Sequence, residues 1–207
     1  MANNRRLEEI KKRESKKKYD EAVRGLSVYP LLTALISVIV LITFSMEWAS
    51  VYNVDLGGNE VEFSGFNLIL AVFTDGYSKM DSSLGDIAVP FYYYAKQYCE
   101  ELGVTTVIAL AFAVITVIFA VIVAIKRAHK LNVAVAGCSV ITAILLIICY
   151  AIALSMSGSD ILPKYCSGNP ACSISSAIII PAIIALVSAV PSVIGAVKYR
   201  LAQKIIK

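Results

Sequence analysis

Four long stretches without a charged residue constrain this chain more than any other feature of its sequence. They cover residues 25–46, 102–125, 131–159 and 165–197, and hold 22, 24, 29 and 33 residues. A helix needs about 20 apolar residues to cross a bilayer, so each stretch is long enough for one crossing and too short for two. Only 16% of the residues are charged and 58% are hydrophobic, whereas soluble domains carry about 25% charged residues. The sequence therefore predicts that lipid surrounds most of the chain.

The predicted fold class is an all-α membrane protein built on a four-helix transmembrane bundle. The transmembrane domain is predicted at 26–198, between a basic juxtamembrane segment at 1–25 and a basic tail at 199–207. Its predicted parts are crossings at 26–46, 104–125, 131–156 and 174–197, a long loop at 47–103 and a short loop at 157–173.

The long first loop is predicted to hold a small β-hairpin or sheet and a short helix. Ala49–Leu56 and Glu60–Ser64 alternate partly in polarity and flank Gly57-Gly58-Asn59, a run typical of a hairpin turn. The apolar run at 65–74 is too short to span a membrane, so we predict a short helix lying on it.

Lysine and arginine are divided very unequally between the two sides of this topology. Sixteen lie in the N-terminal segment, the turn at 126–130 and the C-terminal tail, and three lie in the two loops. Because short segments rich in these cations stay in the cytosol, we predict a multi-pass protein of the cell membrane with both termini cytosolic and both loops outside.

The N-terminal segment is predicted to be helical, since acids precede bases by four positions at Glu8/Lys12 and Asp20/Arg24, among other pairs. It either contacts anionic lipids of the inner leaflet or only determines the topology. Nucleic acid is not an expected partner, because acidic residues interleave the cations.

Small residues recur at helical spacing along one face of the second crossing and one face of the fourth. Hydrophobic attraction between helices is weak in lipid, and small side chains permit close backbone approach. We predict that both faces are buried within the bundle; an oligomer interface and a pore lining are the alternatives. Pro181 and Pro191 are expected to kink the fourth helix. The predicted packing residues are Ala109, Ala113, Ala120, Ala124, Ala182, Ala185, Ala189, Ser192 and Ala196.

Five cysteines are present. Cys138 and Cys149 lie within the third crossing and are expected to be inert small residues. Cys166 and Cys172 close a small loop outside the membrane, where disulfides persist, so a bond between them is the first prediction. A bond from Cys99 to either of them is the alternative, and one thiol is then left free or joins two chains.

Residues for catalysis are scarce. His129, the single histidine, is predicted to be a solvated residue of the cytosolic turn, so histidine metal sites and triads lack parts. No charged residue lies within the four apolar segments, which disfavours an ion-coupled transporter acting as a monomer. No catalytic residue, cofactor or metal is predicted.

The outline resembles the claudin-like tetraspan class of membrane proteins, with four helices, a long first outer loop and a short second one. That class carries a tryptophan after the first crossing, a Gly-Leu-Trp further on and two loop-one cysteines. Here Trp48 is followed 17 residues later by Gly65-Phe66-Asn67-Leu68, while the second tryptophan and the cysteine pair are absent. The resemblance implies a β-sheet in loop one and a role in lateral contacts or accessory binding.

Three hypotheses of function follow. The first is a non-enzymatic accessory protein whose outer loops bind a protein partner or a second copy. The second is a subunit of an oligomeric channel or transport complex, and the third is a membrane thiol redox protein, although no Cys-x-x-Cys pair is present. Aromatic residues are common in binding surfaces, and the predicted outer interaction surface consists of Trp48, Tyr92, Tyr93, Tyr94 and Tyr98.

Overall fold

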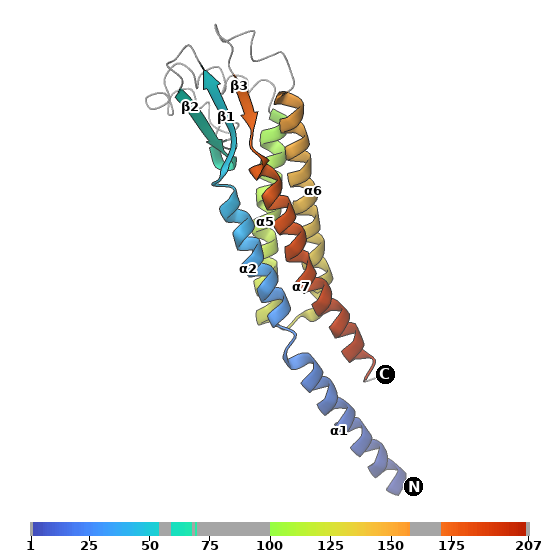
Figure 1. The fold of residues 1–207 in the computed structure, drawn as a ribbon. Coiled ribbons are helices and arrows are strands. Elements are labelled where there is room, and N and C mark those ends of the chain that lie inside the picture. The colour runs from blue at the N-terminus through green and yellow to red at the C-terminus, as the bar shows by residue number, and fades with distance from the viewer. Residues whose placement is uncertain (1, 54–58, 68, 70–99, 158–170, 206–207) are drawn as a thin grey trace.

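The computed structural model describes residues 2–53, 59–67, 69, 100–157 and 171–205. Figure 1 shows its helices and strands in chain order. They are α1 (Ala2–Arg24), α2 (Val28–Thr43), β1 (Glu47–Asn53), β2 (Asn59–Ser64), α5 (Glu100–Ile125), the 3₁₀ turn η3 (His129–Leu131), α6 (Asn132–Ser157), β3 (Ala171–Ile174), the 3₁₀ turn η5 (Ser176–Ile178) and α7 (Ile179–Gln203).

The predicted four-helix transmembrane bundle is confirmed. Among the described residues, four helical stretches are long and apolar enough to cross a membrane: Ile10–Thr43, Leu102–Ile125, His129–Ser155 and Ile179–Gln203. Helices α2, α5, α6 and α7 run up and down in turn, and each packs against the next, with α7 closing the ring onto α2. We call the end with both termini and η3 the termini end, and the end with the strands the sheet end (Figure 1).

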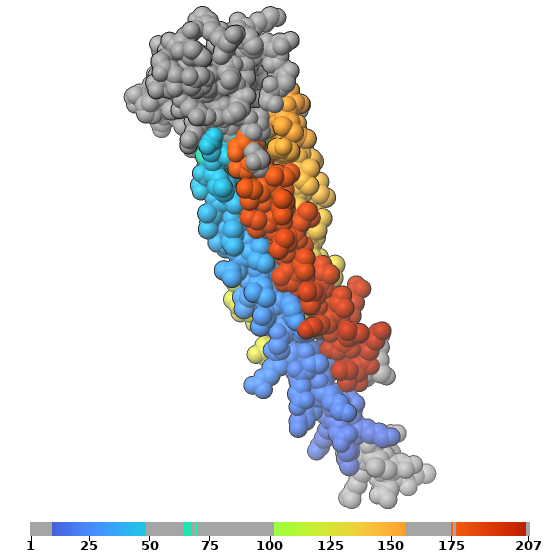
Figure 2. Space-filling model, viewed as in Figure 1, coloured from blue at the N-terminus to red at the C-terminus, as the bar shows by residue number. Residues whose placement is uncertain are grey.

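The distribution of side-chain sizes is that of a bundle in lipid. Large aliphatic residues point outward, as in Leu35 and Ile144, which are 63% and 51% exposed. The interior is filled by small residues and hydroxyls, including Ala109, Ala143 and Thr106. Since lipid solvates the aliphatic surface, close packing of small residues holds the helices together. Figure 2 shows α2 and α7 side by side along one face of the bundle.

All nine of the small residues singled out on α5 and α7 are buried. Their two faces do not chiefly meet each other, because the main neighbours of both helices are α2 and α6. Each of these faces therefore allows its two neighbouring helices to approach closely, as the order of the helices around the ring requires.

A three-stranded antiparallel sheet caps the bundle at the sheet end. Its order is β2-β1-β3, so the first loop supplies the hairpin and the second loop supplies the third strand. The hairpin register pairs Asn53 with Asn59, so β1 ends three residues before the predicted strand end at Leu56, and Asn59, predicted in the turn, begins β2. Helical backbone follows β2 directly at Gly65, with the Ser64 hydroxyl accepting from the Asn67 amide as an N-cap.

Strand β3 changes the start of α7. Because β3 and η5 take residues 171–178, α7 begins at Ile179, five residues after the predicted crossing starts. Pro181 then lies in the first turn, where its missing N–H removes no helical bond, so the expected kink has no cause there. Pro191 lies inside the helix. Helix α7 ends at Gln203. The N-terminal segment is helical, as predicted, and forms α1.

The β1–β3 register predicts a specific cross-link. Val51 lies opposite Cys172, whereas Ser50 lies opposite Ser173 on the other face of the sheet. In a background with Cys99 and Cys166 replaced by Ser, V51C is expected to form a disulfide with Cys172 because opposite residues have suitably close β-carbons. Thiol alkylation followed by mass spectrometry would count the cysteines that a disulfide protects from alkylation. Variant S50C is the control, and equal cross-linking from both positions would contradict the register.

Candidate functional site

The side chain of Trp48 lies inside the bundle, at its sheet end. Its side chain is 0% exposed, its Nε1 donates to the carbonyl oxygen of Thr43 at 3.2 Å, and its ring lies 5.1 Å from that of Phe44. The prediction that Trp48 forms part of an outer interaction surface is therefore wrong. Burial of the large indole ring, with its N–H hydrogen-bonded, stabilises the fold more than exposure of the ring would.

Gly65 is the residue that makes room for this tryptophan. A Cβ at position 65 would lie 2.9 Å from Cζ2 of Trp48 and 3.1 Å from the carbonyl oxygen of Phe44. The next amide, of Phe66, donates to that same carbonyl at 3.1 Å, and the Ser175 amide donates to the Trp48 carbonyl at 3.0 Å. Both loops are thereby tied to the sheet end of α2. We call this assembly of the sheet and its Trp48 anchor the outer platform, a name that follows the predicted orientation.

Hydroxyl groups from all four helices meet in the middle of the bundle, with Ser37 contributed by α2. Thr116, Ser139, Thr142 and Ser188 each donate to a backbone carbonyl of their own helix. The space between them, about 150 Å³, is nowhere wide enough for a water molecule. The hydroxyl donors at this level are therefore paired within their own helices.

One hydroxyl pair does cross between helices. Thr33 of α2 and Ser192 of α7 lie 2.8 Å apart, Oγ1 to Oγ, and both are buried. This hydrogen bond fixes the register of α2 against α7 below the hydroxyl layer.

The termini end is held by a second glycine. A Cβ on Gly195 would lie 2.8 Å from Nδ2 of Asn132 and 2.9 Å from Cβ of Tyr29. Lys198 sits over the Tyr29 ring, 5.0 Å from its centroid, and donates to its hydroxyl. Here α7 therefore touches both α2 and the start of α6.

Two buried polar side chains at this end have no partner among the described residues. His129 is 2% exposed and Asn132 is fully buried, and neither the ring nitrogens nor the amide atoms make a hydrogen bond. The prediction that His129 is a solvated loop residue is therefore wrong. An unpaired buried polar group costs about 1–3 kcal/mol, and no sequence signal marked either residue as buried.

Tyr199 connects three segments beside this pair. Its ring lies 6.0 Å from that of His129, and Gln203 Nε2 donates to its hydroxyl at 3.1 Å. Interaction with the Tyr199 side chain is the main reason that the pKa of Tyr19 on α1 is raised above its ordinary value. Helix α1 is thus attached to the end of α7.

A groove of about 350 Å³ opens next to Tyr199, between η3 with the start of α6 and the end of α7. Two cations line it, Lys130 and Arg200, and none of its lining residues is acidic. Its remaining lining is His129, Val133, Ala196, Tyr199 and Gln203. We call it the basic groove.

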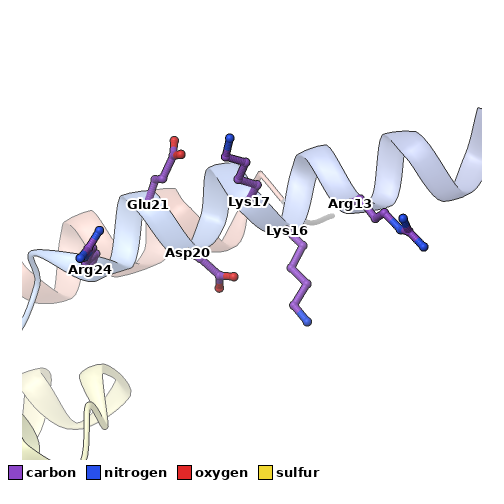
Figure 3. A pocket seen from close by; sticks show the side chains of 6 residues that line it. All are labelled: Arg13, Lys16, Lys17, Asp20, Glu21 and Arg24. Carbon is purple, nitrogen blue, oxygen red and sulfur yellow. The ribbon is translucent and has the colours of Figure 1, made fainter.

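The cations of α1 are arranged differently. In Figure 3, Lys16 and Asp20 point to one side of the helix while Lys17 and Glu21 point to the other. Lys16 and Lys17 thus each have an acid on the same side one turn away, and these two cations point in different directions. The predicted contact of this segment with anionic lipid stays a prediction.

Several predicted site residues lie outside the described part of the chain, namely Tyr92, Tyr93, Tyr94, Tyr98, Cys99 and Cys166. Cys172 lies on β3, and no disulfide is placed between described cysteines; Cys138 and Cys149 are free thiols. No group of three metal-binding side chains occurs among the residues that the structure describes.

Comparison with known proteins yields no relative. No protein-family model matches the chain, and neither a curated protein nor a solved structure matches it.

The contact between Gly65 and Trp48 generates a stability prediction. G65A should lower the free energy of unfolding by about 1–3 kcal/mol, because the added methyl group overpacks the ring and the adjacent carbonyl. Thermal unfolding in detergent can be followed by the fluorescence of Trp48, the single tryptophan. The control is G137A, where an added Cβ meets nothing within 4 Å and alanine favours the helix. A free energy of unfolding of G65A equal to that of the wild type would contradict this packing.

The Thr33–Ser192 bond can be measured by a double-mutant cycle. T33V, S192A and the double variant should show a coupling energy of about 0.6 kcal/mol, with about 1.7 kcal/mol as the upper end for hydrogen bonds between membrane helices. Unfolding in mixed micelles provides the four stabilities. If the stability losses of the two single variants add up to that of the double variant, no hydrogen bond joins the two side chains.

Proposed function

We propose that this protein is a non-enzymatic accessory protein of the cell membrane that binds a protein partner through its outer platform. The observation that carries the proposal is the sheet order, in which β1 pairs with strands from both outer loops. A rigid scaffold that displays loops is a frequent basis for binding. Trp48, on the central strand β1, ties this sheet to α2 through its hydrogen bond to Thr43.

The proposed orientation has both termini in the cytosol. It is supported by the charge of the described residues at the termini end, where Lys126, Lys130, Lys198, Arg200 and Lys204 all lie near the ends of α5, α6 and α7. This distribution agrees with the retention of cationic segments in the cytosol. The outer platform then faces away from the cell interior.

A claudin-like architecture is part of the same proposal. The two residues that carry the resemblance, Trp48 and Gly65, are in contact, and the glycine leaves space for the indole. A loop-one strand pair beside them agrees with what that class implies. On this basis the platform would serve lateral contacts within the membrane, between this protein and a partner.

Site-specific photo-cross-linking in native membranes tests the proposal. A photoreactive residue in place of Phe66, exposed at the sheet end, should capture one discrete partner protein. The same residue in place of Leu35, exposed midway along α2, should capture none, because that face meets lipid. The capture should fall several-fold when G65A perturbs the platform and remain unchanged with G137A. Capture of this chain alone, or equal capture from both positions, would contradict the proposal.

A further inference from the structure

We propose that the basic groove binds the phosphate of an anionic lipid headgroup. The groove lies at the opposite end of the bundle from the outer platform, so lipid binding there does not depend on the proposed function.

The first argument is charge. Lys130 comes from η3 and Arg200 from α7, so only the folded bundle brings these two cations to one groove. An arginine can present two parallel N–H donors to phosphate oxygens, and a lysine adds a point charge. No lining residue is acidic, unlike on α1, where acids alternate with the cations. The groove is therefore selective for anions.

The second argument is unmet hydrogen bonding. His129 lines the groove, is almost fully buried, and has no partner for either ring nitrogen among the described residues. Buried polar groups in native proteins are nearly always paired, so an unpaired one beside a groove points to a ligand. Tyr199 adds a hydroxyl, and Gln203 has a second amide hydrogen beyond the one it donates to Tyr199.

The third argument is the mixture of polar and apolar lining. Val133, 52% exposed, and Ala196 complete the groove wall. They lie on α6 and α7, where those helices leave the polar turn and enter the apolar bundle. A lipid would place its phosphate between the cations and its first carbons against this wall. The volume of about 350 Å³ lies at the lower end of the range of small-molecule sites.

Native mass spectrometry of the full chain tests the site, with phosphatidylglycerol and phosphatidylcholine as probes. Wild-type protein should retain one phosphatidylglycerol per chain in preference to phosphatidylcholine. K130Q/R200Q should weaken this affinity by about 30-fold, at about 5-fold per cation near a membrane surface. The control K126Q/K204Q removes the same charge from exposed positions at the same end that do not line the groove. It should change the affinity by less than about 3-fold at a salt concentration that screens general attraction.

A second variant separates binding from folding. H129L removes the unpaired nitrogens, so the lipid-free protein should unfold at the same or a higher temperature, while its stabilisation by phosphatidylglycerol shrinks. Displacement of the lipid by millimolar inorganic phosphate would identify phosphate itself as the recognised group, and retention would show that the acyl part is needed. Equal losses in the two double variants, or equal retention of the two lipids, would overturn the proposal.

Discussion

Close approach of four helices through small side chains is the contact on which the rest of this structure depends. Lipid solvates the large aliphatic residues outside, so the helices gain stability from dispersion contacts and from hydroxyls that bond their own backbone. Alanines such as Ala109 and Ala182 allow this approach because they leave little between the backbones. The same tight packing leaves no space for water at the hydroxyl layer.

Each end of the bundle is closed by an aromatic residue packed on a glycine. At the sheet end Trp48 rests on Gly65, and its N–H is paired with the Thr43 carbonyl. At the termini end Tyr29 rests on Gly195, but the neighbouring His129 and Asn132 remain unpaired. The two ends therefore differ in hydrogen bonding: the Trp48 N–H is paired, whereas the polar atoms of His129 and Asn132 have no partner among the described residues.

Much of the fold could be predicted because its signals are local. Uncharged stretches of sufficient length identify membrane helices whatever their partners, and a glycine turn between alternating residues identifies a hairpin. The burial of Trp48 could not be predicted in the same way, because a tryptophan after a crossing is equally compatible with a headgroup position. Its burial depends on Gly65 and on a return of the chain to α2. The burial of His129 depends in turn on Tyr199, seventy residues later in the chain.

The sequence by itself determined the solvent, the number of helices and the small-residue faces, because hydropathy and charge act on each segment separately. Only the tertiary structure decided that β3 pairs with β1, that α5 and α7 both pack on α2 and α6, and that Lys130 and Arg200 share a groove. These contacts join segments far apart in the chain. Their stability comes from complementary shapes and paired backbone groups, which no single segment carries.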